Sequence, residues 1–174
     1  MTEQIVAAST PAEYEQFAGL IREYWTWLED RYADHPGLTD SVAGHQALDA
    51  ELAHLSTAYG PPEGLTLLAV RAGAVTGAIA YRDLHDGSCE MKRLFVPTRF
   101  QGQGTGRLLC EALISRASEA GFGLMRLDTG RLNTEAVAMY GSLGFTECAP
   151  YHQYPPDLMA QVLFMERPLT AVRP

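Results

Sequence analysis

The sequence predicts an α+β fold, and three observations lead to it. The chain has 174 residues, the size of one ordinary domain, and its composition of 47% hydrophobic and 20% charged residues is that of a globular protein. Segments with strand and helix patterns follow one another in the order βαα, ββ, βαβαββ. No repeat, low-complexity tract or linker divides them. We therefore expect a single domain over residues 1–174, with about seven strands and about four helices.

The first segment predicts a strand followed by a helix. Residues 4–9 are partly β-branched, and Pro11 ends the strand pattern. Ser9 or Thr10 stands where a hydroxyl caps a helix, and proline is favoured in the first helical turn. Apolar residues then recur every three or four positions, which predicts an amphipathic helix over 11–30.

The next segments predict a second helix and a hairpin. Leucines at helical spacing favour a helix over 41–58, and the stretch YGPPEG at 59–64 ends it. Two apolar runs follow, over 65–73 and 74–84, and they are joined at an Ala-Gly pair that is typical of a tight turn.

The second half of the chain predicts alternating strands and helices. Each segment is set by apolar runs or helical spacing, and glycines at 121 and 144 end the two helices. The expected elements are strands over 90–96, 123–130, 145–151 and 161–169, helices over 104–120 and 133–143, and a loop over 150–157.

Charge and cysteine content exclude several classes of protein. The formal net charge is −8 and no basic stripe is visible, so we expect no nucleic-acid partner. The three cysteines, Cys89, Cys110 and Cys148, show no C-x-x-C spacing, which disfavours a disulfide framework or a cysteine zinc site. No apolar run approaches about 18 residues, so we expect no signal peptide, no membrane partner and a cytoplasmic location.

The stretch RFQGQGTGRLL, which begins at Arg99, carries the strongest functional signal. A phosphate-binding P-loop would need Lys-Ser or Lys-Thr after Gly106, and Arg107 stands where a dinucleotide fingerprint needs its third glycine. Gly102, Gly104 and Gly106 instead favour a pyrophosphate site at a helix N-terminus, where bare amides and the helix dipole attract an anion. Arg99 and Arg107 would add positive charge. A plain glycine-rich turn is the alternative.

Two motifs give the chain a resemblance to the GNAT family of N-acetyltransferases. The stretch EMKRLFVPTRFQGQGTGRLLCEAL resembles the family's core, in which Gln-x-x-Gly-x-Gly is carried by Gln101, Gly104 and Gly106. The stretch NTEAVAMYGSLGF resembles a second motif, N-x-x-A-x-x-x-Y-x-x-x-G-F. That second motif is carried by Asn133, Ala136, Tyr140, Gly144 and Phe145.

The resemblance covers residues 65–169 and implies a fold and a cofactor. It implies an α/β/α sandwich around a mixed, mostly antiparallel sheet with a splayed middle. Residues 1–60 would be variable substrate-side helices, and 65–169 the core that binds acetyl-CoA as acyl donor. The strand before the glycine loop would pair with the pantetheine arm, and the loop would hold the pyrophosphate. The residues so assigned to the cofactor are Leu94, Phe95, Val96, Gln101, Gly102, Gln103, Gly104, Thr105, Gly106, Arg107 and Asn133.

Tyr140 and Glu90 are the candidate catalytic residues that the resemblance suggests. The Tyr140 hydroxyl would donate to the departing thiolate, and the alternative is a core aromatic residue. Glu90 would remove the amine proton, with a pKa raised by a half-buried cleft. Its alternative is an ion pair with Lys92 on the same strand face.

The substrate side would hold a cationic amine among aromatic and acidic residues. The alternative is that these aromatic residues belong to the core. No metal is expected, because the histidines lack ligand spacing. The candidates are Tyr24, Trp25, Trp27, His35, Tyr151, His152 and Tyr154, with Glu29 and Asp30.

The sequence therefore predicts an acyltransferase that acts on a primary amine of a small molecule or on an exposed amino group of a peptide. Direct transfer in a ternary complex is expected, because no cysteine stands where a covalent nucleophile would be. A non-catalytic acyl-CoA-binding module on the same fold is the alternative. The last strand, 161–169, suggests a possible homodimer.

Overall fold

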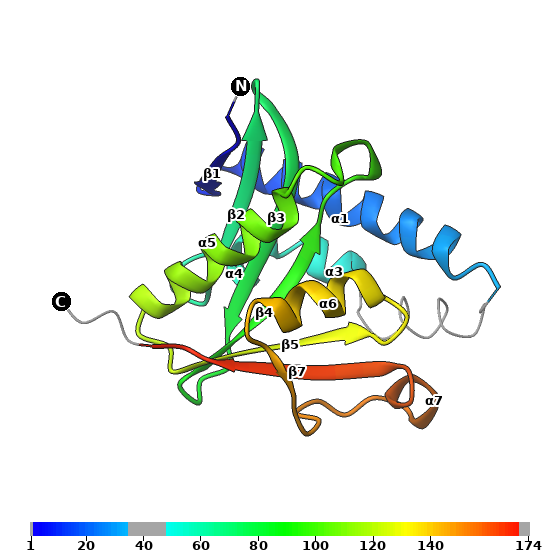
Figure 1. The fold of residues 1–174 in the computed structure, drawn as a ribbon. Helices are drawn as coiled ribbons and strands as arrows, with labels where there is room; N and C mark the ends of the chain where they lie inside the picture. The colour runs from blue at the N-terminus through cyan, green and yellow to red at the C-terminus, as the bar shows by residue number, and fades with distance from the viewer. Residues whose placement is uncertain (1, 35–47, 171–174) are drawn as a thin grey trace.

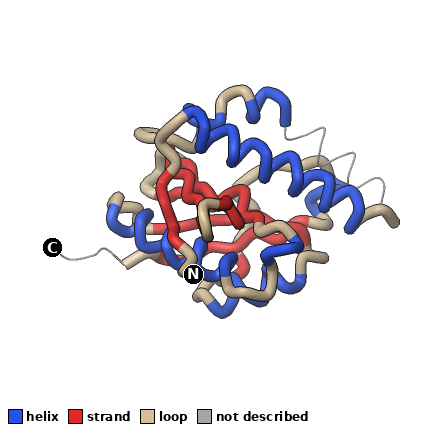
Figure 2. Tube along the Cα trace, turned by 90° about the horizontal axis from the view of Figure 1, so that it is seen from above, coloured by secondary structure: helices blue, strands red, loops and turns tan. Residues whose placement is uncertain are grey.

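The computed structural model describes residues 2–34 and 48–170, and it shows a seven-stranded sheet with helices on both faces (Figure 1, Figure 2). The strand order is β1-β2-β3-β4-β5-β7-β6, and every pair is antiparallel except β4 with β5. The strands are β1 (Gln4–Ala7), β2 (Gly64–Arg71), β3 (Ala74–Asp83), β4 (Ser88–Phe95), β5 (Leu124–Gly130), β6 (Thr146–Glu147) and β7 (Val162–Pro168). The helices are α1 (Pro11–Arg31), α3 (Leu48–Leu52), α4 (Leu55–Ala58), a 3₁₀ turn η1 (Thr98–Phe100), α5 (Thr105–Glu119), α6 (Thr134–Ser142) and α7 (Pro156–Met159). The expected α/β/α sandwich is confirmed.

The sheet separates two hydrophobic clusters. One cluster joins α1 and α4 to the face that carries Leu68 and Phe95, and the other joins α5 and α6 to the face that carries Leu67 and Ile79. The alternation of neighbouring β2 residues between the clusters follows from the two-residue period of a strand. None of the helices in the two described ranges is both long and apolar enough to cross a membrane.

The N-terminus of α1 forms as its sequence predicts. The Thr10 hydroxyl accepts a hydrogen bond from the Glu13 amide, and the Glu13 carboxylate accepts one from the Thr10 amide at 2.8 Å. This reciprocal pair is a capping box, and Pro11 occupies the first turn. The hairpin is also confirmed, since Ala72 and Gly73 both have positive φ, as a two-residue turn between twisted strands requires.

Three expected elements differ in the structure. Part of the expected helix over 41–58 lies outside the described residues, and the rest is two short helices that change direction at His54, where φ is −131°. This turn lets Leu55 reach the core while Glu51 faces β4. The expected strand over 145–151 reduces to β6, because only Thr146 and Glu147 pair with β7.

The third difference is a short helix inside the expected loop over 150–157. Helix α7 begins at Pro156, where the missing amide hydrogen costs nothing in a first helical turn. It places Leu158 in the protein interior and brings the preceding loop against β5 and β7.

The parallel pair β4–β5 opens along its length, and this split positions the candidate site. Pairing is restricted to Ser88–Glu90 with Leu124–Arg126, after which the strands diverge, as Figure 1 shows. A bulge in β4 opposite β3 places Arg93 at φ +59°, and a bulge increases local twist and bends the strand. Among the described residues, the backbone of β4 beyond Glu90 therefore has no strand partner on its β5 side.

Candidate active site

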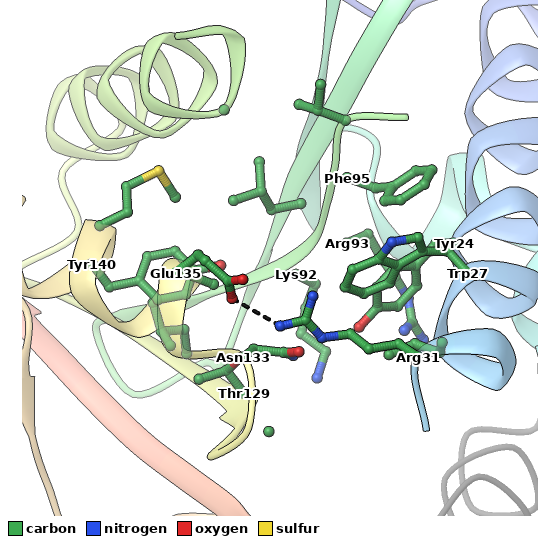
Figure 3. A pocket seen from close by; sticks show the side chains of 18 of the residues that line it. Tyr24, Trp27, Arg31, Lys92, Arg93, Phe95, Thr129, Asn133, Glu135 and Tyr140 are labelled. Atoms are coloured by element: carbon green, nitrogen blue, oxygen red, sulfur yellow. Dashed lines mark hydrogen bonds and ion pairs between the residues drawn. The ribbon is translucent and has the colours of Figure 1, made fainter. Parts of the chain in front are cut away.

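A cavity of about 670 Å³ occupies the split between β4 and β5 (Figure 3). Its walls are the diverging ends of the two strands, the loop before α5, the first turns of α5 and α6, and the second half of α1. The volume falls within the usual range of small-molecule sites, about 300–1,000 Å³.

Ten of the eleven residues assigned to the cofactor line this cavity, and Gln103 is the exception. The Gln103 side chain instead accepts a hydrogen bond from Arg71 of β2. Thr105 lines the cavity, but its hydroxyl donates to the Glu3 carboxylate at 2.7 Å. These two side chains therefore tie the loop to the sheet.

The three glycines of the loop have two different explanations. Gly102 and Gly104 have φ of +73° and +84°, a region that other residues rarely adopt, and Gly104 is the N-cap of α5. Gly106 has no such φ, and an added Cβ would lie 3.9 Å from its nearest neighbours, Met139 Sδ and Val96 Cγ2. Neither backbone conformation nor packing requires glycine at 106. The bare backbone there suits close approach of a ligand.

Of the two arginines expected near the pyrophosphate, only Arg107 lines the cavity. Arg107 pairs with Glu111 at 3.2 Å and also contacts Ser142 of α6. Arg99 is absent from the cavity wall and pairs with Glu23 of α1. The positive charge at the start of α5 is therefore supplied by Arg107 and the helix dipole.

Tyr140 lies on α6 and lines the cavity, as the resemblance predicts (Figure 3). Burial raises its pKa well above the ordinary tyrosine value, so its hydroxyl is protonated at neutral pH. Within residues 2–34 and 48–170 this hydroxyl has no hydrogen-bond partner. Asn133 occupies the N-cap position of α6, but its side chain makes no capping bond and accepts from the Tyr32 hydroxyl at 2.7 Å.

The expectation of a raised pKa at Glu90 is wrong. Burial alone would raise it, but a hydrogen bond with His152 and the charges of Lys92 and Arg82 outweigh burial and lower the Glu90 pKa to about 2. Arg82 Nε donates at 2.7 Å, the Tyr151 hydroxyl donates at 3.1 Å, and His152 Nε2 lies at 2.7 Å. Glu90 is fully buried and does not line the cavity. The sequence alternative of a pair with Lys92 is present, at 3.7 Å.

Asp128 of β5 is the carboxylate nearer the reaction space, and our sequence reasoning missed it. It lines the cavity, accepts from Lys92 Nζ at 3.2 Å, and accepts from the Tyr154 hydroxyl. The sequence feature that could have indicated Asp128 is its position near the end of a short strand, five residues before Asn133. In open sheets, ligands bind beyond the carboxyl ends of the strands, where polar groups at the strand ends can contact them.

A buried ion pair at the bulge of β4 was also missed. Arg93 and Glu51 of α3 have side chains only 7% and 13% exposed, and Arg93 Nε donates to Glu51 at 2.7 Å with a second bond alongside. The Tyr59 hydroxyl donates to the same carboxylate at 2.8 Å. The sequence gives no signal for this pair, because its two residues lie 42 positions apart. Nor does it predict the bulge, since arginine rarely adopts a positive φ.

The predicted substrate-side residues divide into two groups. Tyr24, Trp25, Trp27 and Tyr154 line the cavity, whereas Tyr151 and His152 contact Glu90 and do not. His35 lies outside the described residues.

The expected acidic partners of a cationic amine are not at the site. Glu29 and Asp30 are exposed on the outer face of α1, because that helix turns its apolar side to the sheet, and neither lines the cavity. Among residues 2–34 and 48–170, the acidic residues that do line it are Asp128 and Glu135.

The comparisons with known proteins agree with this geometry. Residues 20–145 match the acetyltransferase (GNAT) family. An uncharacterized N-acetyltransferase of Schizosaccharomyces pombe is 34% identical over 166 residues, which cover 94% of this chain and 95% of that protein. An IAA acetyltransferase of Azospirillum brasilense is 38% identical over 110 residues, covering 62% of this chain and 70% of that one.

Solved structures confirm the fold. The PaiA N-acetyltransferase of Thermoplasma acidophilum, crystallised with coenzyme A, has a TM-score of 0.74 at 18% identity, covering 97% of this chain and 99% of that one. A putative acyl-CoA N-acyltransferase of Klebsiella pneumoniae has a TM-score of 0.66 at 24% identity, with the same coverage. The chain therefore belongs to the GNAT family of acetyltransferases and is an acyltransferase.

Proposed function

We propose that the protein transfers the acetyl group of acetyl-CoA to a primary amine of a small molecule or to an exposed amino group, directly within a ternary complex. One observation carries the proposal. A single cavity joins the glycine loop and the N-terminus of α5 to the Tyr140 hydroxyl and to an aromatic wall on α1. The acetyl donor and the amine acceptor can therefore bind next to each other in this cavity.

The donor half of the cavity suits a pyrophosphate followed by an extended arm. The first amides of α5 have no intrahelical acceptor, and the first turn holds no acidic residue. From Met91 onward β4 has an unpaired edge toward β5, which an extended amide-containing arm can join as a strand would. The crystallised PaiA enzyme, which carries coenzyme A, supports an acyl-CoA donor for this fold.

The reaction forms a bond between the amine nitrogen and the acetyl carbon, and it breaks the bond between that carbon and sulfur. Tyr140 would donate a hydrogen bond to the leaving sulfur. A thiol has an ordinary pKa of about 8.5, below that of a buried phenol, so we assign Tyr140 to stabilising the thiolate rather than to losing its proton outright.

Asp128 is the proposed acceptor of the amine proton, directly or through water. It lines the cavity, whereas Glu90 lies beyond Lys92 and does not. A general base must reach the proton it removes, so position favours Asp128.

The cysteines support direct transfer. Burial raises the pKa of the Cys89 and Cys110 thiols to about 12, and neither of these nor Cys148 lines the cavity. A covalent acyl-cysteine step would need an accessible thiolate.

Thermal unfolding with acetyl-CoA, free CoA or NADH tests the proposal first. A ligand at about one hundred times its dissociation constant stabilises the fold by about 2.7 kcal/mol, which is about 5–10 °C for a domain of this size. We expect a shift with both CoA compounds and none with NADH, followed by thiol release when amines are added. No shift with either CoA compound would overturn the donor assignment. A shift without thiol release from a broad amine panel would favour the binding module.

A further inference from the structure

We infer that the acceptor is a small amine that also carries a carboxylate, and that Arg31 binds this carboxylate. The inference deepens the proposed transferase function and rests on it. It starts from the charges of the cavity wall: among the described residues, four cationic side chains and two carboxylates line it, and each cation has a carboxylate partner. A ligand carboxylate can therefore bind here by taking the place of one of these partners.

The four cations are not equivalent. Arg107 lies at the start of α5, where the pyrophosphate of the donor accounts for it. Arg93 is held by Glu51 in a buried pair, and Lys92 is held by Asp128 with both side chains less than 15% exposed. These three have assigned partners, so the remaining cation is Arg31.

Arg31 has the partner that is easiest to exchange. Its guanidinium donates to Glu135 at 2.8 Å, but the Glu135 side chain is 75% exposed, against 31% for Arg31. Ion pairs with so exposed a partner contribute little to stability, because water competes for the carboxylate. A carboxylate that arrives inside the cavity, away from water, is a stronger partner for the same guanidinium.

The Arg31 side chain is also held in place for this role. Its guanidinium carbon lies 5.0 Å from the centre of the Trp27 ring, so the planar group stacks on an aromatic face. Figure 3 shows it extending from α1 across the cavity toward α6, in front of Lys92. A stacked, planar guanidinium binds carboxylate with two parallel hydrogen bonds and loses little entropy in doing so.

The rest of the acceptor wall sets the other features of the substrate. The end of α1 lies against the end of β5, since the Tyr32 hydroxyl bonds to Asn133 and lies 3.2 Å from where a Cβ on Gly130 would be. This contact joins the end of α1 to the end of β5 at one side of the cavity. Its side walls are mostly apolar, so an amino acid with an apolar or aromatic side chain fits the combination. The walls are formed by Trp27, Leu28, Phe95, Tyr154 and Leu158.

The test compares three acceptors that differ only in the carboxylate: L-phenylalanine, L-phenylalanine amide and 2-phenylethylamine, with the leucine series in parallel. Thiol release from acetyl-CoA gives kcat/KM for each. The three amines differ in basicity, so the informative quantity is the change in the ratio of acid to amide between the parent protein and each variant.

The inference predicts opposite changes in kcat/KM for two variants. Arg31→Gln removes the guanidinium and is expected to lower kcat/KM for the amino acid about tenfold to a hundredfold while leaving the amide nearly unchanged. Glu135→Gln removes the competing carboxylate and is expected to raise kcat/KM for the amino acid severalfold. Arg22→Gln, on the same helix and paired with Glu15, is the matched control and should change neither ratio.

A bridge that only braces α1 against α6 predicts a different result, because both variants would break it equally. Equal losses in Arg31→Gln and Glu135→Gln, an unchanged ratio in both, or turnover confined to amines without a carboxylate would each overturn the inference. Calorimetric binding of the three compounds to the complex with CoA gives the same comparison without turnover. A failure of the transferase proposal is therefore distinguishable from a failure of the carboxylate site.

Discussion

The two ends of the β4–β5 pair have opposite chemistry. At the paired end, Ser88–Glu90 pair in register with Leu124–Arg126, and the Glu90 carboxylate is surrounded by Arg82, Tyr151 and His152. At the open end, Met91–Phe95 with Leu127–Gly130, strand bonds are missing and a 670 Å³ cavity takes their place.

Lys92 stands between the two ends and contacts a carboxylate on each side, Glu90 at 3.7 Å and Asp128 at 3.2 Å. Both carboxylates have the same cation as a neighbour, yet only Asp128 faces a space that a ligand can enter. The comparison teaches that access to the cavity, rather than the mere presence of an acidic residue, separates the two carboxylates. Both accept hydrogen bonds on each oxygen, so bonding alone does not distinguish them.

The largest effect should come from removing the Tyr140 hydroxyl at the open end. Tyr140→Phe is expected to lower kcat by about 10²–10⁴, because the leaving thiolate loses its donor, while the acetyl-CoA thermal shift persists. Tyr81→Phe is the matched control, since Tyr81 is equally buried, packs edge-on against Phe122 and does not line the cavity. Equal activities of the two variants would mean that Tyr140 is only a core residue.

The second prediction separates the two carboxylates. Asp128→Asn is expected to lower kcat/KM by about 10², the lower range for a lost general base, and to lower stability as well, because it breaks the largely buried pair with Lys92. Its deficit should shrink as pH rises, because an amine that is already deprotonated needs no base. Glu90→Gln should lower stability but change kcat by no more than a few-fold. A pH-rate profile of both variants decides the assignment, and a loss confined to Glu90→Gln would restore Glu90 as the base.

The stability effect at Glu90 follows from its lowered pKa. The folded-state pKa is about 2 and the ordinary carboxyl value is 4.5, which corresponds to about 3 kcal/mol of stability from ionised Glu90. This contribution is fully present above pH 4.5 and is lost as pH falls toward 2. Glu90→Gln should therefore cost about 3 kcal/mol in urea unfolding at pH 7 and much less near pH 3. Glu15→Gln, an exposed ion-pair residue, should cost less than about 1 kcal/mol at either pH.

The open end also explains what sequence reasoning reached and what it missed. The donor half is built from backbone: glycines at positive φ, helix N-terminal amides and an unpaired strand edge. Glycine spacing reports such features directly, so Gly102 and Gly104 could be singled out from the sequence, whereas Tyr140 was assigned through its family motif.

The acceptor half is built from side chains that the fold brings together from distant segments. Arg31 and Glu135 are separated by 104 residues, and Arg93 and Glu51 by 42. A local sequence pattern does not show which side chains from distant segments come into contact. For the same reason the direction of the Glu90 pKa shift was predicted wrongly. The hydrogen-bond donors His152 and Tyr151 come from a loop more than 60 residues away.

The smallest predicted effect tests whether the loop glycines serve the ligand or only the backbone. Gly104 and Gly121 flank α5 with φ of +84° and +91°, and a Cβ at either position would meet no atom within 4 Å. Alanine at either site should therefore cost a similar 1–2 kcal/mol of stability, since both force a left-handed conformation on a larger residue.

Binding should separate these two variants, because only Gly104 lines the cavity. A backbone that relaxes at 104 moves the first amides of α5 away from the pyrophosphate, so Gly104→Ala is expected to weaken acetyl-CoA binding about tenfold, which is about 1.4 kcal/mol. Gly121→Ala, at the far end of the same helix, should bind acetyl-CoA as the parent does. Calorimetric titration of both variants, below their unfolding temperatures, measures the difference directly. Equal affinities would assign Gly104 to the turn alone and leave Gly106, which no backbone requirement explains, as the glycine that admits the donor.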